Sequence, residues 1–582
     1  MKANARSTAA VLAMALTAAG LSACAARPDY PVTQEGKTFT QVNERARGTA
    51  PPVAAGVSSE DIARARSARP DDWLTYYGAY DGQRYSLLDQ ITTTNVKQLK
   101  PAWVFQAGVI GLVATPATYS FEASPIVVDG VMFVSGWDGY VWALDAENGE
   151  MLWTYKHAIP LDTPLCCGNV NRGVAVADGK VFVSTANGYL VAIDATNGRP
   201  LWQKPFADVR AGESATAAPL VVKNLVLVGS SGAEYGVRGH LDAFDFTGRH
   251  VWRRYTIPKP GEPGSETWQG DAWATGGGST WITGTYDPEL DLVYWGTGNP
   301  GPDFDGSVRP GDNLYASSVI AIDPDDGAIR WHYQWTPHDV WDYDGVNENI
   351  LLDKDGRKLL AHFDKNGYLF ILDRTNGKLV RTVPYGRVSW GSIDSGTGKV
   401  TVQQEPTPEG VEICPGPAGL KEWPHAAYNQ RTGLLYTPVV EQCATFKLAK
   451  TEFREGMPYW GGGAEPVQEQ WGHVKAIDPS TGKEVWSWRN DHPMLSSLLT
   501  TAGGLVFAGK PTGEFVAFDA RSGELLWQFQ TGSGIHSNPV TYTVNGKQYI
   551  AVPTGWGGWV EGYAPELYGA PRGTALFVFA LP

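Results

Sequence analysis

Two eleven-residue stretches, ALDAENGEMLW (143–153) and AIDATNGRPLW (192–202), share the pattern Ala-x-Asp-x-x-x-Gly-x-x-x-Trp. Asp and Gly favour hairpin turns, so each stretch predicts two apolar strands joined by a turn. The pattern recurs at intervals of about 40 to 50 residues, which is typical of the blades of a β-propeller. Further copies lie at 321–331, 476–486 and 517–527, with a shorter copy at 243–252 and a degenerate copy at 371–380.

The spacing of the copies predicts an all-β propeller of seven or eight blades. The tryptophan that ends each copy is expected to cover a neighbouring blade. A closed ring removes the exposed edges of open sheets. We therefore expect the closing blade to join the early strands near Tyr85 to the last strand, at 575–581.

The composition is that of a globular chain with many turns. Of 582 residues, 43% are hydrophobic and 19% are charged, with 68 Gly, 39 Pro, 23 Trp and 25 Tyr. This balance excludes a disordered chain, and the abundance of Trp and Tyr favours strands. The formal net charge of −14 argues against nucleic-acid binding, so no nucleic-acid partner is expected.

The N-terminus predicts export to the periplasm. A positive region at Lys2 and Arg6 precedes an apolar run at 9–21 that is too short to span a bilayer. Residues 1–23 are therefore interpreted as a signal peptide. The stretch LSAC at 21–24 resembles a bacterial lipobox, in which Cys24 would carry a lipid and provide the sole membrane contact; a plain signal peptide remains the alternative.

The rest of the chain divides into a tether and one large domain. Residues 24–70 are expected to form a lipidated tether with one short helix at 58–66, where Ser58 and Asp61 have the spacing of a capping box. Residues 71–582 are expected to form the propeller.

Four cysteines remain beyond Cys24, which makes two disulfides plausible in an oxidising compartment. Cys166 and Cys167 are neighbours, and consecutive Cα atoms lie ~3.8 Å apart, closer than in most disulfides. A bridge between them would be strained. From spacing alone, two free thiols, or crosslinks from each to Cys414 or Cys443, are equally open.

Oxygen-bearing side chains gather around the longest insertion in the repeat, between Trp252 and Trp331. Carboxylate and amide oxygens are the ligands that hard cations prefer. Each such residue alone is more often a turn or surface residue, but four of them could form a cation cage: Glu234, Asn299, Asp342 and Asp344.

These stretches resemble the pyrroloquinoline-quinone (PQQ) alcohol dehydrogenases, the family of methanol and ethanol dehydrogenases. The resemblance extends over 73–582, and its most specific parts are CCGNVNR (166–172), GAE (232–234), TGNP (297–300) and PHDVWDYDG (337–345). It implies an eight-bladed propeller with PQQ near its axis. It also implies oxidation of an alcohol to an aldehyde or ketone by hydride transfer to quinone C5.

The resemblance implies a role for each matching residue. Asp342 would be the catalytic base, and Lys365 would lie beside the quinone oxygens. PQQ would be held between a Cys166–Cys167 disulfide and the Trp281 ring, with polar contacts from Glu122, Arg172, Thr216 and Ser231. A metal acting as Lewis acid would be bound by Glu234, Asn299, Asp342 and Asp344. A second disulfide would join Cys414 to Cys443.

Three departures from methanol dehydrogenases bear on the metal and the substrate. Asp344 adds a carboxylate that lanthanide-using relatives carry, so calcium and a lanthanide both remain open. Glu422 and Leu495 stand where methanol dehydrogenases have an Asn and a Trp near the quinone, which would admit larger or secondary alcohols.

The electron acceptor is expected to be a separate protein, such as a soluble cytochrome c, because the sequence has no Cys-x-x-Cys-His motif for covalent haem. Two alternatives to an alcohol dehydrogenase remain open. One is a PQQ sugar or polyol dehydrogenase of the same fold. The other is a non-enzymatic propeller lipoprotein, which would leave the co-occurrence of Cys166, Cys167, Glu234, Asn299 and Asp342 without a reason.

Overall fold

The computed structural model describes residues 57–108, 120–137, 139–160, 163–165, 167–467, 469–557, 567 and 573–582. The chain divides into two compact units, 1–37 and 38–582, and every described residue belongs to the second. The predicted signal peptide, the lipidation site Cys24, most of the tether and Cys166 lie outside the described residues.

Helices in the described part are few and short. Helix α1 (Ser59–Ala63) begins at the N-cap Ser58, whose hydroxyl accepts from Asp61 N while the Asp61 carboxylate accepts from Ser58 N. The predicted capping box is therefore confirmed. None of the helices in the described residues is long and apolar enough to span a bilayer. The others are α2 (Ala65–Ala68) and the 3-10 helices η1 (Val96–Gln98), η3 (Ala233–Tyr235), η4 (Ser265–Thr267), η5 (Ala272–Thr275) and η6 (Gly306–Val308).

Strands dominate the described chain, so the predicted all-β class is confirmed. Five sheets consist of four antiparallel strands in chain order. These sheets are β3 (Ile126–Val128), β4 (Val131–Ser135), β5 (Tyr140–Asp145), β6 (Met151–Lys156); β7 (Ala175–Ala177), β8 (Lys180–Ser184), β9 (Tyr189–Asp194), β10 (Pro200–Pro205); β11 (Leu220–Val222), β12 (Leu225–Gly229), β13 (His240–Asp245), β14 (His250–Tyr255); β15 (Thr285–Asp287), β16 (Leu292–Thr297), β17 (Ser318–Ile322), β18 (Ile329–Gln334); and β19 (Ile350–Lys354), β20 (Arg357–Phe363), β21 (Tyr368–Asp373), β22 (Lys378–Pro384).

Three further large sheets combine strands that are not all consecutive, in the orders β26-β27-β30-β31, β1-β32-β33-β34-β35 and β2-β38-β37-β36. Their strands are β26 (Ala427–Asn429), β27 (Leu434–Glu441), β30 (Trp471–Ile477), β31 (Glu484–Asn490); β1 (Tyr85–Ser86), β32 (Leu499–Thr501), β33 (Leu505–Gly509), β34 (Glu514–Asp519), β35 (Leu525–Gln530); and β2 (Lys100–Gly108), β36 (Val540–Val544), β37 (Lys547–Thr554), β38 (Thr574–Ala580). Two small sheets contain β23 (Gly391–Ile393), β24 (Val400–Val402); and β25 (Val411–Ile413), β28 (Ala444–Leu448), β29 (Gly462–Pro466).

The prediction that the last strand joins the strands near Tyr85 was wrong. Tyr85 lies in β1, which pairs in parallel with β32, whereas β38 pairs antiparallel with β2. The two residues of β1 cannot satisfy the edge of a seven-residue strand, but the nine residues of β2 can. The last large sheet therefore contains an early strand, as predicted, but a different one.

The repeat tryptophans pack on the glycine turns of the next repeat, as predicted. A Cβ added at Gly198 would lie 2.8 Å from the Trp153 ring, and Trp153 Nε1 donates to Ala195 O at 2.9 Å. Gly198 has φ +74°, which glycine adopts without strain. The same contact joins Trp202 to Gly248, Trp252 to Gly327, Trp331 to Gly377 and Trp486 to Gly523.

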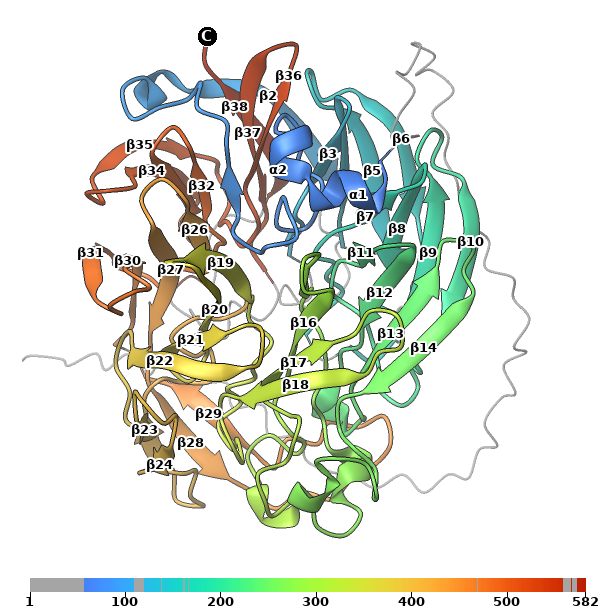
Figure 1. Ribbon diagram of the computed structural model, residues 1–582, viewed down its shortest axis with the longest axis vertical. Coiled ribbons are helices and arrows are strands. Elements are labelled where there is room, and N and C mark those ends of the chain that lie inside the picture. Colours follow the sequence, from blue (N-terminus) through green and yellow to red (C-terminus); the bar gives the residue numbers. More distant parts are fainter. Residues whose placement is uncertain are drawn as a thin grey trace, which may run out of the picture. The chain divides into compact units, whose positions relative to one another are not determined.

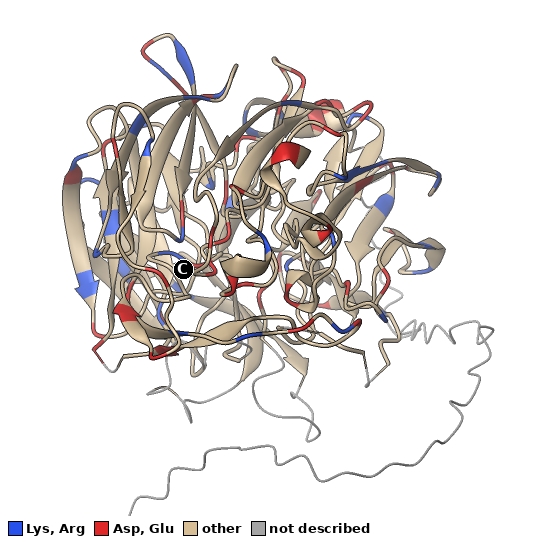
Figure 2. Ribbon diagram, turned by 90° about the horizontal axis from the view of Figure 1, so that it is seen from below, with Lys and Arg blue, Asp and Glu red and all other residues tan. Residues whose placement is uncertain are grey.

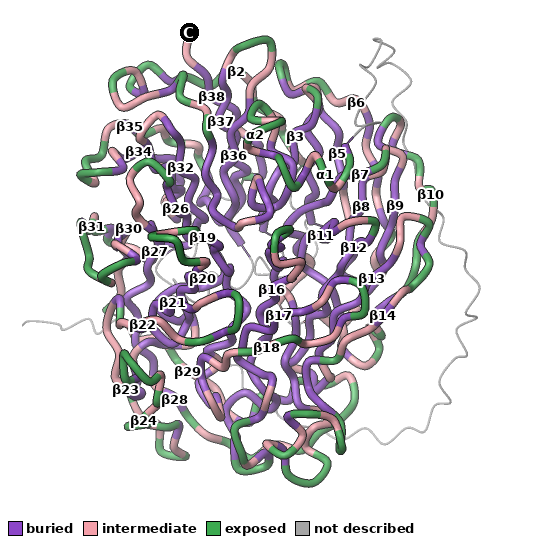
Figure 3. Tube along the Cα trace, in the orientation of Figure 1, coloured by how far each residue is buried: buried purple, intermediate pink, exposed green. Residues whose placement is uncertain are grey.

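The first and last sheets are linked in the same way. Trp103, in β2, lies against Gly149, the turn glycine of the first repeat, where an added Cβ would be 2.5 Å from the ring. In Figure 1 the large sheets follow one another in chain order around a common centre. Figure 3 shows the interior strands buried and the outer turns exposed. Acidic and basic residues are interspersed along the chain (Figure 2).

Candidate active site

One cavity of about 340 Å³ brings most of the predicted site residues together. The residues lie in segments that connect strands, and those strands belong to different sheets, so no short stretch of chain could form the cavity alone. The predicted residues that line it are Glu122, Cys167, Arg172, Thr216, Ser231, Glu234, Trp281, Asp342, Asp344 and Lys365. Asn299 is not among the lining residues but contacts two residues that are.

Arg172 lies between two indole rings. Its Cζ is 5.0 Å from the ring centroid of Trp281 and 4.7 Å from that of Trp423, and its Nη2 is 2.9 Å from Glu122 Oε2. Its Nε and Nη1 are buried without a hydrogen-bond partner in the described part of the chain. A guanidinium fork with two such donors on the cavity suits a ligand with acceptor oxygens, such as a carboxylate.

Trp281 is held at its backbone and at its ring. Thr216 Oγ1 lies 3.1 Å from Ser231 Oγ and 3.3 Å from the carbonyl oxygen of Trp281. The Trp281 indole donates to Asp344 Oδ1 at 3.3 Å. These contacts fix the plane of an aromatic ring that forms part of the cavity wall.

Asp342 and Asp344 share one ammonium group. Lys365 Nζ lies 3.5 Å from Asp342 Oδ2 and 3.0 Å from Asp344 Oδ2. Both aspartates have left-handed backbone, with φ of 62° and 54°. The Asp339 carboxylate stabilises this turn by accepting from Trp341 N and from Tyr343 N. Such conformations cost about 1–3 kcal/mol each and persist where the surrounding structure holds them.

Glu234 is presented by the short helix η3. A Cβ at the preceding Gly232 would lie 2.1 Å from the carbonyl oxygen of Gly212, so only glycine fits that approach. Glu234 Oε2 is buried and has no hydrogen-bond partner among the described residues. Its enclosure raises the pKa of Glu234 to about 7.

The neighbouring carboxyl groups are also shifted. Burial raises the pKa of Asp342 well above its ordinary value, and Lys365 opposes this shift. Burial also raises the pKa of Asp303, and the nearby Glu234 raises it further. The Lys365 ammonium group thus interacts with Glu234, Asp342 and Asp344, and Asp303 interacts with Glu234, an arrangement that a bound cation would relieve.

Sequence reasoning missed several residues that line the cavity, among them Asp303, Trp423 and His536. Asp303 follows the quoted TGNP stretch by three positions, and Trp423 follows Glu422, so their neighbourhood carried a signal. His536 carried none, and burial lowers its pKa to about 4.

The two departures that bear on the substrate, Glu422 and Leu495, differ in their position relative to the cavity. Glu422 lines the cavity, as expected. Leu495 is fully buried against Ala418, Val440 and Trp556 and is not among the lining residues. Leu495 therefore adds no side chain to the cavity wall, and the admission of larger alcohols stays a prediction.

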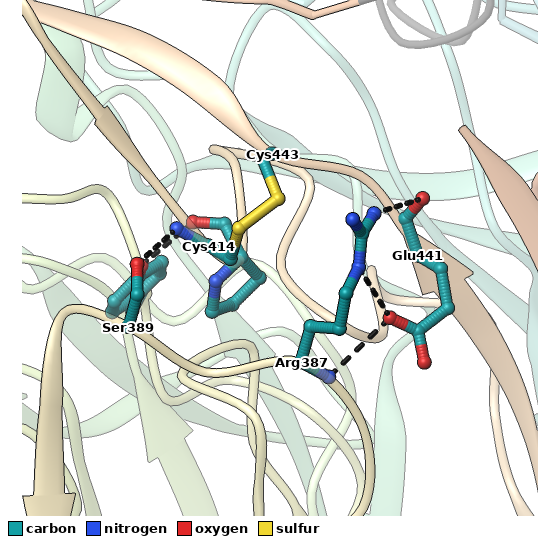
Figure 4. Close-up of a disulfide and its surroundings, with 7 residues drawn as sticks. Arg387, Ser389, Cys414, Glu441 and Cys443 are labelled. Carbon is teal, nitrogen blue, oxygen red and sulfur yellow. Dashed lines mark hydrogen bonds and ion pairs between the residues drawn. A yellow bond between two sulfur atoms is a disulfide. The ribbon is translucent and has the colours of Figure 1, made fainter. Parts of the chain in front are cut away.

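The predicted Cys414–Cys443 disulfide is confirmed (Figure 4). It links the end of β25 to the segment before β28, and Cys414 N donates to Ser389 Oγ at 2.9 Å. Cys167 lines the cavity and is disulfide-bonded. Cys166 lies outside the described residues, so the adjacent bridge stays a prediction.

The metal site also stays a prediction. Over the described ranges, no three His, Cys, Asp or Glu side chains are arranged as ligands around one point. The chemistry of the donors nevertheless fits a hard cation. Glu234 has an unpartnered oxygen, and Asn299 N lies 3.3 Å from Asp344 Oδ1, so carboxylate and amide oxygens occupy one neighbourhood.

The family model and the similar proteins that follow are all dehydrogenases. The family model "Glucose/ethanol/alcohol dehydrogenase, beta-propeller domain" matches residues 73–406 and 489–550. The chain is 38% identical to quinoprotein alcohol dehydrogenase PedH of Pseudomonas putida over 567 residues, covering 91% of this chain and 94% of that protein. It is 39% identical to a lanthanide-dependent methanol dehydrogenase of Methylacidiphilum fumariolicum, covering 84% and 85%.

A solved structure is similar over nearly the same range. A europium-containing methanol dehydrogenase matches with a TM-score of 0.83 and 36% sequence identity, covering 90% of this chain and 100% of that chain. The described sheets are therefore of the propeller type.

Proposed function

The chain belongs to the family of PQQ-dependent alcohol dehydrogenases, and from this premise we propose that its cavity binds PQQ and a metal ion and oxidises an alcohol to an aldehyde or ketone. The observation that carries the proposal is the pair of unpartnered Arg172 donors beside the Trp281 ring, in the same cavity as Asp342 and Lys365. The non-enzymatic scaffold considered above is wrong, because the matched relatives are dehydrogenases.

The cofactor would be held by a ring and a guanidinium fork. Trp281 would stack on one face of PQQ and Cys167, bridged to Cys166, would cover the other. Arg172 would donate its two free N–H groups to a carboxylate. Thr216 and Ser231 would supply hydroxyls. When bound, PQQ supplies a quinone carbon that accepts hydride, and the metal supplies a Lewis acid.

Asp342 is proposed as the base. Its side chain is 26% exposed within the cavity, whereas that of Asp344 is 5% exposed, so a substrate hydroxyl can reach Asp342 more readily. The Asp342 carboxylate would accept the proton of the substrate hydroxyl, while hydride leaves the carbon that carries this hydroxyl. Lys365, 3.5 Å away, favours the ionised carboxylate that this step needs.

We propose a lanthanide as the metal, held by Glu234, Asn299, Asp342 and Asp344. The number of carboxyl groups favours a trivalent ion over calcium, and a relative and a solved structure carry lanthanide and europium in their names. An apolar part of the cavity wall, formed by Leu165, Phe304 and Trp460, favours a simple alcohol over a sugar or polyol.

The architecture and location complete the proposal. The described residues form seven sheets of four strands and one of five, which we interpret as eight blades. The contact of Trp103 with Gly149 would join the last blade to the first. We place the enzyme in the periplasm on a lipid anchor at Cys24, with electrons passing to a soluble cytochrome c.

Reconstitution tests the proposal. The purified protein is loaded with PQQ and either Ca²⁺ or La³⁺ and assayed on an alcohol panel with a dye acceptor. Asp342→Asn should keep bound PQQ, seen in its absorbance, while turnover falls by about 10²–10⁴-fold. Turnover within tenfold of the wild type would exclude Asp342 as the base. Failure to retain PQQ in the wild type would exclude the cavity as its site.

A further inference from the structure

We infer that Asp303 is a positioning residue that fixes the orientation of the Asn299 amide, so that the amide oxygen is available to a bound cation. The inference rests on the proposed function, because it concerns the metal proposed above. Asp303 lines the cavity, yet no step of the proposed reaction uses it.

The contact between the two side chains is direct and buried. Asn299 Nδ2 donates to Asp303 Oδ1 at 3.0 Å, and the two residues are 3% and 5% exposed. The amide nitrogen of Asn299, and not its amide oxygen, therefore faces the Asp303 carboxyl group. The amide oxygen then points away from Asp303, and none of the described residues donates to it.

The position of Asp303 is itself fixed. The fully buried Arg309 donates from Nη2 to the carbonyl oxygens of Pro302, at 2.9 Å, and of Asp303, at 3.3 Å. Arg309 also donates from Nη2 to Asp339 O in the turn that carries Asp342. One guanidinium thus ties the segment of Asp303 to the turn of the proposed base.

The orientation matters because the two ends of an amide are opposite in their action on a cation. The oxygen ligates a hard cation, whereas the NH₂ group presents positive hydrogens to it. The backbone N–H of Asn299 lies 3.3 Å from Asp344 Oδ1, which places the residue beside another proposed ligand. Loss of a hydrogen-bond partner behind a ligand typically weakens metal binding about 10–100-fold.

Two substitutions separate orientation from charge. Asp303→Ala removes the acceptor. Asp303→Asn removes the charge but retains an oxygen that can accept from Asn299 Nδ2. Asp305→Asn is the matched control, because Asp305 is also buried, at 4% exposed, on the same segment. Its carboxylate accepts from Ser307 N rather than from a proposed ligand.

The readout is metal binding rather than turnover. Tb³⁺ is titrated into the metal-free full chain, and its luminescence is excited through tryptophan, since the Trp281 indole donates to Asp344 at 3.3 Å. We expect Asp303→Ala to weaken Tb³⁺ affinity about 10–100-fold. Asp303→Asn and Asp305→Asn should stay within about threefold of the wild type.

The same substitution is also made in the Asn299→Asp variant, which distinguishes a loss of amide orientation from a loss of stability caused by Asp303→Ala. In Asn299→Asp the two side-chain oxygens are equivalent, so no orientation needs to be held. Asp303→Ala should then leave Tb³⁺ affinity unchanged or raise it, whereas a general loss of folding would weaken both backgrounds alike and overturn the inference.

The outcomes are distinct. Asp303→Ala within threefold of the wild type, or Asp303→Asn as weak as Asp303→Ala, would overturn the positioning role and leave the proposed function intact. A wild type with no saturable Tb³⁺ luminescence would overturn the proposed metal site and this inference together.

Discussion

The contact between each repeat tryptophan and a turn glycine leads to a prediction about stability. Gly198→Ala should destabilise the protein much more than Gly179→Ala. Both glycines have left-handed backbone, with φ of +74° and +68°. Both alanines therefore pay a similar backbone cost, about 1–2 kcal/mol. The surroundings differ, because a Cβ at Gly179 meets nothing within 4 Å, whereas one at Gly198 lies 2.8 Å from the Trp153 ring.

The extra destabilisation expected from Gly198→Ala comes from the packing and the hydrogen bond that the Trp153 ring would lose. Trp153 is 2% exposed and donates from Nε1 to Ala195 O at 2.9 Å, so a displaced ring either strains the core or leaves a buried donor unpaired. Overpacking costs about 1–3 kcal/mol, and an unpaired buried donor costs about as much. We expect Gly198→Ala to lower the free energy of unfolding by about 1–3 kcal/mol more than Gly179→Ala.

Urea unfolding followed by tryptophan fluorescence measures both variants against the wild type. A third protein, Gly198→Ala combined with Trp153→Leu, removes the ring, and there the alanine should cost no more than at Gly179. A difference below about 0.5 kcal/mol between the two single variants would refute the claim that the indole is held on this turn.

Three further predictions concern the cavity and acid stability. Arg172→Lys keeps the charge but loses the planar fork, so the PQQ Kd should rise about 10–100-fold in equilibrium dialysis, and an unchanged Kd would contradict the fork. Asp344→Ala should reduce lanthanide-supported turnover more than calcium-supported turnover, whereas equal losses would exclude Asp344 as a metal selector. Burial lowers the pKa of His157 to about 4, so its neutral form contributes stability that is present above pH 6.5 and is lost as the pH falls towards 4. His157→Phe should therefore flatten the fall of the free energy of unfolding between pH 6.5 and 4, by up to about 1.4 kcal/mol per pH unit, and calorimetric stability profiles that stay parallel would count against this assignment.

Much of the fold was predictable because its determinants are local. A turn with Asp and Gly at a set spacing selects a hairpin, and a tryptophan four residues after the glycine has a set place on the following strand. The pairing of β38 was not predictable in this way. Which early strand completes the last sheet depends on how much edge each can cover, and Tyr85 and Trp103 both lie in segments with strand character.

The cavity residues also fall into two groups, those that the sequence identifies and those that only the structure identifies. Residue types and motifs identified Arg172, Glu234, Trp281 and Asp342 from the sequence, because their chemistry is distinctive and they match a family. Asp303 carries the same carboxylate as many turn residues, and only its distance to Asn299 distinguishes it. Leu495 shows the converse, because its motif position suggested the cavity while packing placed it in the core.

The amino-acid sequence alone was sufficient for the repeated hairpins, the Cys414–Cys443 pairing implied by family resemblance, and the class of chemistry. Each of these depends on residues close together in the chain or on a specific motif. Tertiary structure alone decided which strand closes the last sheet, which side chains face the cavity and which hydrogen bonds orient them. Those outcomes depend on contacts between loops of different sheets, whose distances follow from the packing of tryptophans on glycine turns and not from spacing along the chain.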